Sequence, residues 1–388
     1  MPARKQQSSE GVKVNYRAKN RRIQFLTLLS SSEISALSER ALAVLSQERC
    51  LTIAEIAQAH DGSLGMAHAY IDAVARTGAD AIKFQTHYAD YESSPDEPFR
   101  VKFSPQDATR YDYWKRLEFG PEQWAELAAH ARACGLLFLS SPFSAYAIEV
   151  LEPCNVPAWK VASGELSNLP LLDRLCATGK PILLSSGMSG WQELDSAVER
   201  VRRYGNVMCV MQCTTAYPCP PARVGLNVMQ EMRERYGSFV GLSDHSGTPW
   251  PAIAATVQGA NAVEAHVTFD RAMFGPDVPA SLTIEEMASV VSGIRFVEAM
   301  RANPVDKAAT AATYDTLRAM FSQGLVAAHD LPAGSLIGPD SLSTRKPLRG
   351  IPASQYDAVL GRTLRVALPA GTPLEEAHLQ AAKPGEVL

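Results

Sequence analysis

Lysines and histidines at the ends of short apolar runs are the first residues of this chain that could do chemistry. Lys83 and Lys160 lie in two such runs, and His245 and His266 lie at the ends of two later ones. Ammonium groups attract phosphate and carboxylate, and neutral imidazoles are common ligands of divalent metal ions. These residue types therefore indicate a site for an anion beside a metal ion.

The two lysines are predicted to project into one pocket, where they repel each other unless an anion lies between them. A phosphate or carboxylate would contact both, and nearby hydroxyls would complete its cradle. The candidate hydroxyls are those of Ser141, Ser163, Ser185 and Ser186. Alternatively, each lysine forms a structural ion pair with Glu55 or Glu165, but both lysines together with the serines favour the anion site.

His245 and His266 are expected to end neighbouring parallel strands, which lie about 4.8 Å apart. Two imidazoles at matching depth can share one divalent ion and leave positions open for water and substrate. That arrangement suits Mn²⁺, Mg²⁺ or Zn²⁺ acting as a Lewis acid on a carbonyl group. A single histidine at a strand end is more often only hydrogen-bonded. Here an acidic residue accompanies each imidazole, Asp244 and Glu264, and the pair favours a metal site.

Other polar residues carry weaker signals. We expect His60 to line the same pocket, and we expect surface or packing roles for His68, His130, His329 and His378. Asp277, in the tight loop Phe274-Gly275-Pro276-Asp277, could accept hydrogen bonds from sugar hydroxyls, although a turn cap is the simpler interpretation of that residue alone.

A barrel of eight strands would bring these side chains together. From residue 51 onward, an apolar run, a polar cluster and an amphipathic stretch follow one another eight times. This alternation indicates a parallel sheet covered on both faces, and eight units favour an α/β fold of the (β/α)8 TIM-barrel type, with catalytic groups at the carboxyl ends of the strands. No Gly-rich dinucleotide-binding loop follows the first run. The predicted strands are 51–55, 81–86, 136–141, 159–163, 182–186, 207–213, 239–244 and 263–268.

The bulk properties agree with a large globular protein. The chain has 388 residues, 46% of them hydrophobic, and a formal net charge of −4. A negative net charge does not favour binding to nucleic acid. No apolar stretch approaches the ~20 residues that span a bilayer. The seven cysteines are scattered and odd in number, which favours reduced thiols and a cytoplasmic location.

Taken together, these residues resemble the sialic acid synthase family, which comprises N-acetylneuraminate, legionaminate and pseudaminate synthases. The resemblance extends from about residue 50 to 365. It is carried, in chain order, by Glu55-Ile56 with His60-Asp61-Gly62, Lys83-Phe84-Gln85-Thr86, Ser141-Pro142-Phe143-Ser144, Lys160-Val-Ala-Ser-Gly-Glu165, Leu184-Ser-Ser-Gly-Met188, Cys213-Thr214 with Tyr217-Pro218, Gly241-Leu-Ser-Asp-His245, Glu264-Ala-His266 and Gly275-Pro-Asp277.

The resemblance implies an enzyme that condenses phosphoenolpyruvate with an amino sugar to give a nine-carbon 2-keto acid and phosphate. It also implies that His245 and His266 hold a divalent metal, usually Mn²⁺. Phosphoenolpyruvate would be cradled by Lys83, Ser141, Lys160, Ser163, Ser185 and Ser243, with Ser186 beside them. The open-chain sugar and the proton transfers would involve Glu55, Tyr217, Glu264 and Asp277, with Glu165 close by and Gln85 at the sugar.

Two positions near the expected acceptor differ from the family pattern. A histidine that usually precedes the Cys-Thr pair is Gln212 here, and an asparagine of the sialic acid enzymes is Thr215. The acceptor is therefore either N-acetylmannosamine-like or a 2,4-diacetamido-trideoxyhexose. The hairpin that usually precedes the first strand is also not visible, and residues 1–48 form a different N-terminal extension.

The end of the chain resembles the antifreeze-like (SAF) domain of these synthases. We assign residues 49–302 to the barrel, 303–319 to a linker and 320–388 to this domain. In the family the domain crosses to the partner's barrel in a homodimer and places an arginine over the acceptor sugar. The aligned residue here is Lys346, and Arg345 or Arg349 could substitute for that arginine. A solvated basic loop is the alternative.

Two other functions stay open. One is a different phosphoenolpyruvate-dependent synthase that makes a seven- or eight-carbon sugar acid, and the antifreeze-like tail argues against it because such enzymes generally lack one. The other is a non-catalytic sugar-binding relative. The presence of both lysines and both histidines disfavours that alternative, whereas Gln212 and Lys346 keep it open.

Overall fold

The structure is a computed structural model that describes residues 45, 49–99 and 102–381. The chain forms two compact units, which divide between Ala302 and Asn303. The N-terminal extension assigned to residues 1–48 lies outside the described residues, apart from Leu45. Across the described part of the chain, no helix combines the length and apolar character that crossing a bilayer requires.

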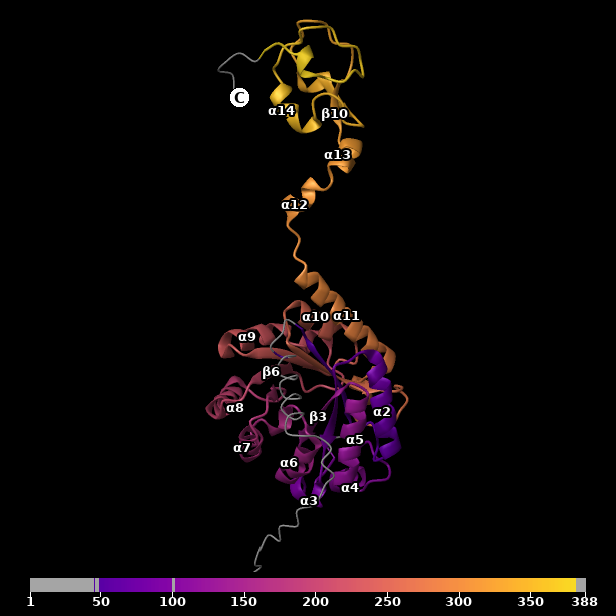
Figure 1. Ribbon diagram of the computed structural model, residues 1–388, viewed down its shortest axis with the longest axis vertical. Coiled ribbons are helices and arrows are strands. Elements are labelled where there is room, and N and C mark those ends of the chain that lie inside the picture. Colours follow the sequence, from indigo (N-terminus) through magenta and orange to yellow (C-terminus); the bar gives the residue numbers. More distant parts are fainter. Residues whose placement is uncertain (1–44, 46–48, 100–101, 382–388) are drawn as a thin grey trace, which may run out of the picture. The chain divides into compact units, whose positions relative to one another are not determined.

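The first unit is a closed ring of eight parallel strands with helices outside it (Figure 1). The strands pair in sequence order, and β1 also pairs with β8, which closes the ring and confirms the predicted barrel. The fourth strand ends two residues earlier than predicted because Ser163–Glu165 form a 3-10 turn. The bounds are β1 Leu51–Ala57, β2 Ala81–Thr86, β3 Leu137–Pro142, β4 Trp159–Val161, β5 Ile182–Ser185, β6 Met208–Cys213, β7 Phe239–Asp244 and β8 Ala262–Thr268, with a short β9 Leu282–Thr283.

The outer helices cover the ring with apolar faces. In α8, for example, Leu194, Ala197, Val198 and Val201 are buried, a spacing that places all four on one face of the helix. The main helices are α2 Leu64–Thr77, α5 Pro121–Ala133, α6 Ala145–Leu151, α7 Leu169–Ala177, α8 Trp191–Tyr204, α9 Leu226–Tyr236, α10 Trp250–Val257 and α11 Ile284–Ala302.

The interior of the ring is apolar at the amino-terminal end and ionised at the carboxyl end. Ile53, Leu139 and Leu183 belong to the buried cluster near the starts of the strands. Toward the carboxyl ends of the strands, the pairing register places polar residues of neighbouring strands side by side. Glu55 on β1 pairs with Lys83 on β2 and with His266 on β8. Pairing between neighbouring strands therefore sets the relative positions of these functional side chains.

An insertion between β2 and β3 adds two short helices, α3 Ala89–Glu92 and α4 Arg110–Leu117. It has its own small core, in which Tyr113, Trp114 and Leu117 pack with Ala89. Thr109 and Asp112 form a capping box that starts α4. This insertion is therefore an ordered part of the first unit rather than a simple connecting loop.

The second unit begins with two helices, α12 Lys307–Ala312 and α13 Asp315–Phe321, where a linker was expected. Strands β10 Gly324–Ala327 and β11 Leu342–Arg345 pair antiparallel, and α14 Tyr356–Val359 follows. Two Leu-Pro-Ala-Gly turns, at residues 331–334 and 368–371, lie side by side, because Leu331 and Leu368 exchange backbone hydrogen bonds of 2.9 and 2.8 Å. Both leucines belong to the apolar core of this unit.

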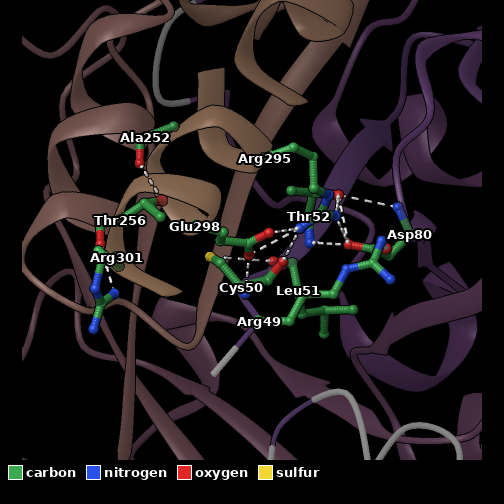
Figure 2. A network of polar contacts seen from close by, with 10 residues as sticks. All are labelled: Arg49, Cys50, Leu51, Thr52, Asp80, Ala252, Thr256, Arg295, Glu298 and Arg301. Atoms are coloured by element: carbon green, nitrogen blue, oxygen red, sulfur yellow. Dashed lines mark hydrogen bonds and ion pairs between the residues drawn. The ribbon is translucent and has the colours of Figure 1, made fainter. Parts of the chain in front are cut away.

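A charged network joins the last barrel helix to the first two strands (Figure 2). Arg295 on α11 donates to the carbonyl of Cys50 over 3.0 Å and to Asp80 Oδ2 over 2.5 Å. Asp80 in turn accepts from the backbone and the hydroxyl of Thr52, and Glu298 accepts from the backbone N–H of Cys50. One guanidinium thereby fixes the start of β1 against the start of β2.

Replacing this guanidinium should weaken the barrel. Arg295→Ala would leave the largely buried carboxylate of Glu298 without its cation and would leave Asp80 with only the half-exposed Arg49 as a partner, so we expect the free energy of unfolding to fall by about 2 kcal/mol. Arg203→Ala is the control, because Arg203 pairs with Glu199 at the surface and should cost no more than about 0.5 kcal/mol. Denaturant unfolding of both variants makes the comparison, and equal small losses would show that the network does not stabilise the barrel.

Candidate active site

A cavity of about 610 Å³ opens where the carboxyl ends of the eight strands meet. Each strand of the ring contributes at least one side chain to its lining: Glu55, Lys83, Gln85, Ser141, Lys160, Ser185, Cys213, Ser243, Glu264 and His266. The following loops and turns add Ser163, Thr215, Tyr217, His245 and Asp277. The structure thus gathers most of the predicted site residues around one cavity, at the end of the barrel that carries the active site in TIM-barrel enzymes.

Four ionisable side chains are buried together in this cavity, and we call Glu55, Lys83, Lys160 and Glu264 the ion quartet. Lys83 contacts the carboxylate of Glu55 and lies 3.8 Å from Glu264 Oε2. Lys160 lies 3.1 Å from Glu264 Oε1. All four side chains are at most 5% exposed. Lys83 thus forms one of the ion pairs that the sequence left open, whereas Lys160 pairs with Glu264 and not with Glu165.

Glu264 links the two ammonium groups and is held ionised between them. Burial alone would raise the pKa of its carboxyl group, but Lys160 and Lys83 outweigh burial and lower the pKa to about 2. Ser243 donates its hydroxyl to Glu264 Oε1 over 3.1 Å. The quartet therefore contains two ammonium groups balanced by two carboxylates, and it can exist in a buried cavity without a net charge.

Several buried polar atoms of the cavity have no hydrogen-bond partner among the described residues. They are Ser185 Oγ, Thr215 Oγ1, Glu55 Oε2 and Glu264 Oε2, and the two carboxylate oxygens lie beside the ammonium group of Lys83. A buried polar atom without a partner is costly, unless water or a ligand supplies one. Ser141 Oγ, in contrast, already accepts a hydrogen bond of 3.1 Å from Lys83. The unpartnered atoms are the natural contacts for a polar ligand in this cavity.

His245 and His266 form a pair with ring centroids 5.3 Å apart. His245 donates its Nδ1–H to the carbonyl of Thr214 over 2.9 Å, which leaves the lone pair on Nε2. Burial, together with His266, lowers the pKa of His245 to about 3, so its imidazole is neutral. The hydroxyl of Tyr217 lies 3.1 Å from His245 Nε2, and Asp277 Oδ2 lies 4.0 Å from His266 Nδ1.

This pair fits a divalent metal ion. A carbonyl that accepts the Nδ1–H of a histidine is the usual support of a metal-bound imidazole, because it orients the ring and presents Nε2. His245 and His266 would supply two nitrogen ligands and leave the other positions to water and substrate. The residues of the pair therefore fit a metal ion, and their role as its ligands stays a prediction.

Two predicted site residues point away from the cavity because side chains alternate along a strand. Cys213 lines the cavity, so Gln212 faces the opposite side of β6, where its amide donates to the carbonyl of Val224 over 3.1 Å. Ser186 follows the cavity residue Ser185 and donates to the carbonyl of Met211 over 3.1 Å. Neither Gln212 nor Ser186 belongs to the lining.

Glu165 and His60 also lie outside the lining. The carboxylate of Glu165 accepts a 2.7 Å hydrogen bond from Asn168, and burial raises the pKa of Glu165. His60 is buried against Phe119, with ring centroids 4.7 Å apart, and burial lowers the pKa of His60 to about 3. Both residues thus pack behind the site instead of entering it, and the expectation that His60 lines the pocket was wrong.

The three basic residues predicted for the acceptor lie in the second unit. Arg345, Lys346 and Arg349 are all exposed there. The ammonium group of Lys346 lies 5.5 Å from the ring centroid of Phe321. The structure of this unit alone thus shows these side chains at its surface.

One side of the cavity is formed by residues that sequence reasoning missed. We call Phe99, Phe103, Tyr113, Trp114 and Phe143 the aromatic wall. Four of these five residues come from the insertion between β2 and β3, and Arg110 from the same insertion also lines the cavity. The high aromatic content of residues 99–114 was the available signal. It follows no strand or helix repeat, which is why the barrel pattern did not reveal it.

Known protein families match both units of this chain. The model of the NeuB family matches residues 70–306, and that of the SAF domain matches residues 322–380. The N,N'-diacetyllegionaminic acid synthase of Campylobacter jejuni is 31% identical over 321 residues, which cover 81% of this chain and 96% of that protein. The human N-acetylneuraminate-9-phosphate synthase is 30% identical over 328 residues, which cover 83% and 90%.

Among solved structures, the N-acetylneuraminic acid synthetase of Leptospira borgpetersenii, crystallised with citrate, is similar with a TM-score of 0.60. It is 24% identical, and the match covers 69% of this chain and 92% of that one. The likeness supports the same fold.

From the matches to the family, to its curated members and to the SAF domain, we conclude that this chain belongs to the NeuB family and is an enzyme of the N-acetylneuraminate synthase type.

Proposed function

We propose that this enzyme condenses phosphoenolpyruvate with a six-carbon acetamido sugar to give a nine-carbon 2-keto acid and phosphate. The observation that carries the proposal is the ion quartet, with two buried lysines beside unpartnered hydroxyls in one cavity. The names of the curated relatives support the same reaction type. The acceptor is either N-acetylmannosamine-like or a 2,4-diacetamido-trideoxyhexose.

The ion quartet suits phosphoenolpyruvate because that molecule carries both a carboxylate and a phosphate. Without substrate, Glu55 and Glu264 balance the charges of Lys83 and Lys160. A bound dianion or trianion would neutralise part of the positive charge of the two lysines in place of the carboxylates. It would accept charge-assisted hydrogen bonds from both ammonium groups. Ser185 offers a hydroxyl without a partner in the described structure, as a cradle for such an anion requires.

A divalent metal, for which Mn²⁺ is the expected choice, would be held by His245 and His266. When bound, it supplies Lewis-acid polarisation of the sugar aldehyde. The protein's own contribution is to keep His245 neutral and oriented through the Thr214 carbonyl, and to place Tyr217 and Asp277 beside the two imidazoles.

The reaction balances with one water molecule. The methylene carbon of phosphoenolpyruvate bonds to the aldehyde carbon, water adds to the adjacent carbon that bears the phosphate, and the C–O bond to phosphate breaks. Of the two protons of water, one balances the proton that the aldehyde oxygen gains. The other leaves the new hydroxyl as it becomes the ketone, and the departing phosphate takes it up. Glu264, held as a carboxylate by the two lysines, can accept the proton of water, and the Tyr217 hydroxyl can donate to the developing alkoxide.

The acceptor is expected to lie against the aromatic wall. Its rings offer apolar surface to acetamido methyl groups and to the methyl group of a deoxy sugar, while Arg110 offers a donor at the same side of the cavity. Thr215 presents a buried hydroxyl without a hydrogen-bond partner among the described residues. These contacts favour a sugar with several apolar substituents, and the 2,4-diacetamido-trideoxyhexose has more of them than N-acetylmannosamine.

We further infer a homodimer in which the second unit of one subunit completes the site of its partner. Arg345, Lys346 and Arg349 are exposed on that unit and are free of a salt bridge in the described structure. These three exposed basic side chains are not part of the apolar core of their unit. They could instead contact a sugar hydroxyl or carbonyl in a neighbouring barrel. Lys346 would make such a contact as a point charge.

Phosphate release from phosphoenolpyruvate tests the reaction. With Mn²⁺, we expect phosphate only when a six-carbon acetamido sugar is present, and His266→Ala should abolish this metal-dependent release while leaving thermal unfolding little changed. His329→Gln, an exposed histidine in the second unit, is the matched control. Release with a four- or five-carbon sugar phosphate would instead establish the synthase of shorter sugar acids, and no release with any sugar would favour a binding protein.

The anion pocket is tested by Lys160→Met. Loss of a charge-assisted contact of about 3 kcal/mol should lower kcat/KM for phosphoenolpyruvate about 100-fold and should change the KM for the sugar little. Lys115→Met removes an exposed lysine that pairs with Asp90, and it should leave both constants unchanged. If Lys160→Met acted on the sugar KM alone, the assignment of phosphoenolpyruvate to the quartet would be incorrect.

The shared site is tested by mixing two inactive proteins. One carries Lys160→Met, and the other carries Arg345→Ala, Lys346→Ala and Arg349→Ala together. After subunit exchange, half of the dimers are mixed and one of their two sites is intact, so about a quarter of the wild-type activity should return. Activity equal to the mean of the two separate proteins would contradict a shared site, and so would full activity of the triple variant.

A further inference from the structure

Two neighbouring helices outside the barrel mouth bring a second set of metal-ligating side chains together. His68 and Asp72 lie on α2, while Glu126 and His130 lie on α5, which Cys134 caps. Residues four apart share one face of a helix, and α2 packs against α5. These faces meet, although the sequence predicted only surface or packing roles for the two histidines.

Three of these residues converge on one point. In the described part of the chain, Asp72, His130 and Cys134 are the single group of three whose ligand atoms all lie within 4.8 Å of one another. His130 Nε2 lies 3.1 Å from Asp72 Oδ1, and Cys134 Sγ lies 3.9 Å from the same oxygen. In a tetrahedral zinc site, ligand atoms are about 3.3–3.8 Å apart, given the usual metal–ligand bond lengths. The three atoms already stand close to such an arrangement.

A chain of hydrogen-bonding groups behind His130 favours a cation at this point. His130 Nδ1 lies 2.8 Å from His68 Nδ1, so one of these two atoms must carry a proton and the other accept it. His68 Nε2 makes no hydrogen bond within the described residues, but it lies 3.2 Å from the carboxylate of Glu126, whose negative charge favours a proton on Nε2 and leaves Nδ1 of His68 as the acceptor. The Nδ1 proton then belongs to His130.

With its proton on Nδ1, a neutral His130 carries a lone pair on Nε2, which lies 3.1 Å from Asp72 Oδ1. Two lone pairs at 3.1 Å repel each other unless a proton or a metal ion lies between them. Metal-bound histidines usually donate their second ring N–H to a neighbouring acceptor, as His130 does to His68 here. A proton shared between His130 and Asp72 would not explain why the sulfur of Cys134 lies beside them, whereas a metal ion would use that sulfur as a third ligand.

We propose that Asp72, His130 and Cys134 bind a divalent metal ion, with Zn²⁺ preferred and water as the fourth ligand. One thiolate, one imidazole and one carboxylate form a ligand set of borderline softness, which suits Zn²⁺ better than Mn²⁺ or Mg²⁺. His68 is a positioning residue that orients His130. Because the site lies on outer helices, its metal would tie α2 to α5, and the proposal stands independently of the reaction at the barrel mouth.

Cobalt binding tests this site in the full-length protein, because a thiolate ligand gives Co²⁺ a charge-transfer band in the near ultraviolet. The background carries His266→Ala, which removes a histidine from the barrel mouth. In that background we expect one equivalent of Co²⁺ with the thiolate band. Adding Cys134→Ser should remove the band and weaken binding more than about 100-fold, and adding Asp72→Asn should also weaken binding strongly.

Two further variants separate the roles. His68→Gln should keep the band but weaken Co²⁺ binding about 10- to 100-fold, as expected for a residue that orients a ligand. His329→Gln, an exposed histidine in the second unit, should leave binding and band unchanged. The proposal is overturned if the band persists in Cys134→Ser, which would assign it to another cysteine such as Cys213. It is also overturned if Asp72→Asn binds Co²⁺ as well as its parent does.

Discussion

The charge balance of the ion quartet is the constraint on which the rest of the active site depends. Four ionisable side chains, each at most 5% exposed, occupy a barrel interior that is otherwise apolar. A single unpaired charge in that place would be strongly destabilising, whereas paired charges are tolerated. Glu55 and Lys83 lie on neighbouring strands, whereas Glu264 on β8 reaches across the ring to Lys160 on β4. The relative positions of these strands therefore control the charge balance of the site.

The same strand register positions the functionally important residues at both ends of β1 and β2. At their amino-terminal ends, Thr52 and Asp80 are joined through the network that Arg295 anchors. At their carboxyl ends, the same two strands carry Glu55 and Lys83. A shift of one strand by one residue would turn an inward side chain outward and leave the opposing charge without its partner. The network at one end and the buried Glu55–Lys83 ion pair at the other thus rely on the same register.

Much of the barrel could be predicted from the sequence because eight apolar runs end in polar clusters, a pattern with few structural solutions. The side-chain directions were harder to obtain. Gln212 and Ser186 each stand next to a cavity residue, and only the phase of strand alternation decides that they face away. Glu165 was expected close to the site from the family resemblance, and as an alternative ion-pair partner of a lysine, but it lies in a 3-10 turn and its carboxylate accepts from Asn168.

Features without a strand or helix repeat escaped sequence reasoning altogether, and they lie where substrate choice is expected to be made. The ion quartet and the histidine pair come from strands and the turns that follow them, whereas the aromatic wall comes mainly from the insertion before β3. Since strand register restricts the first group and not the second, the insertion can change with little effect on the charge balance. If the proposed reaction is right, the aromatic wall is the part of the cavity where one acceptor sugar would be distinguished from another.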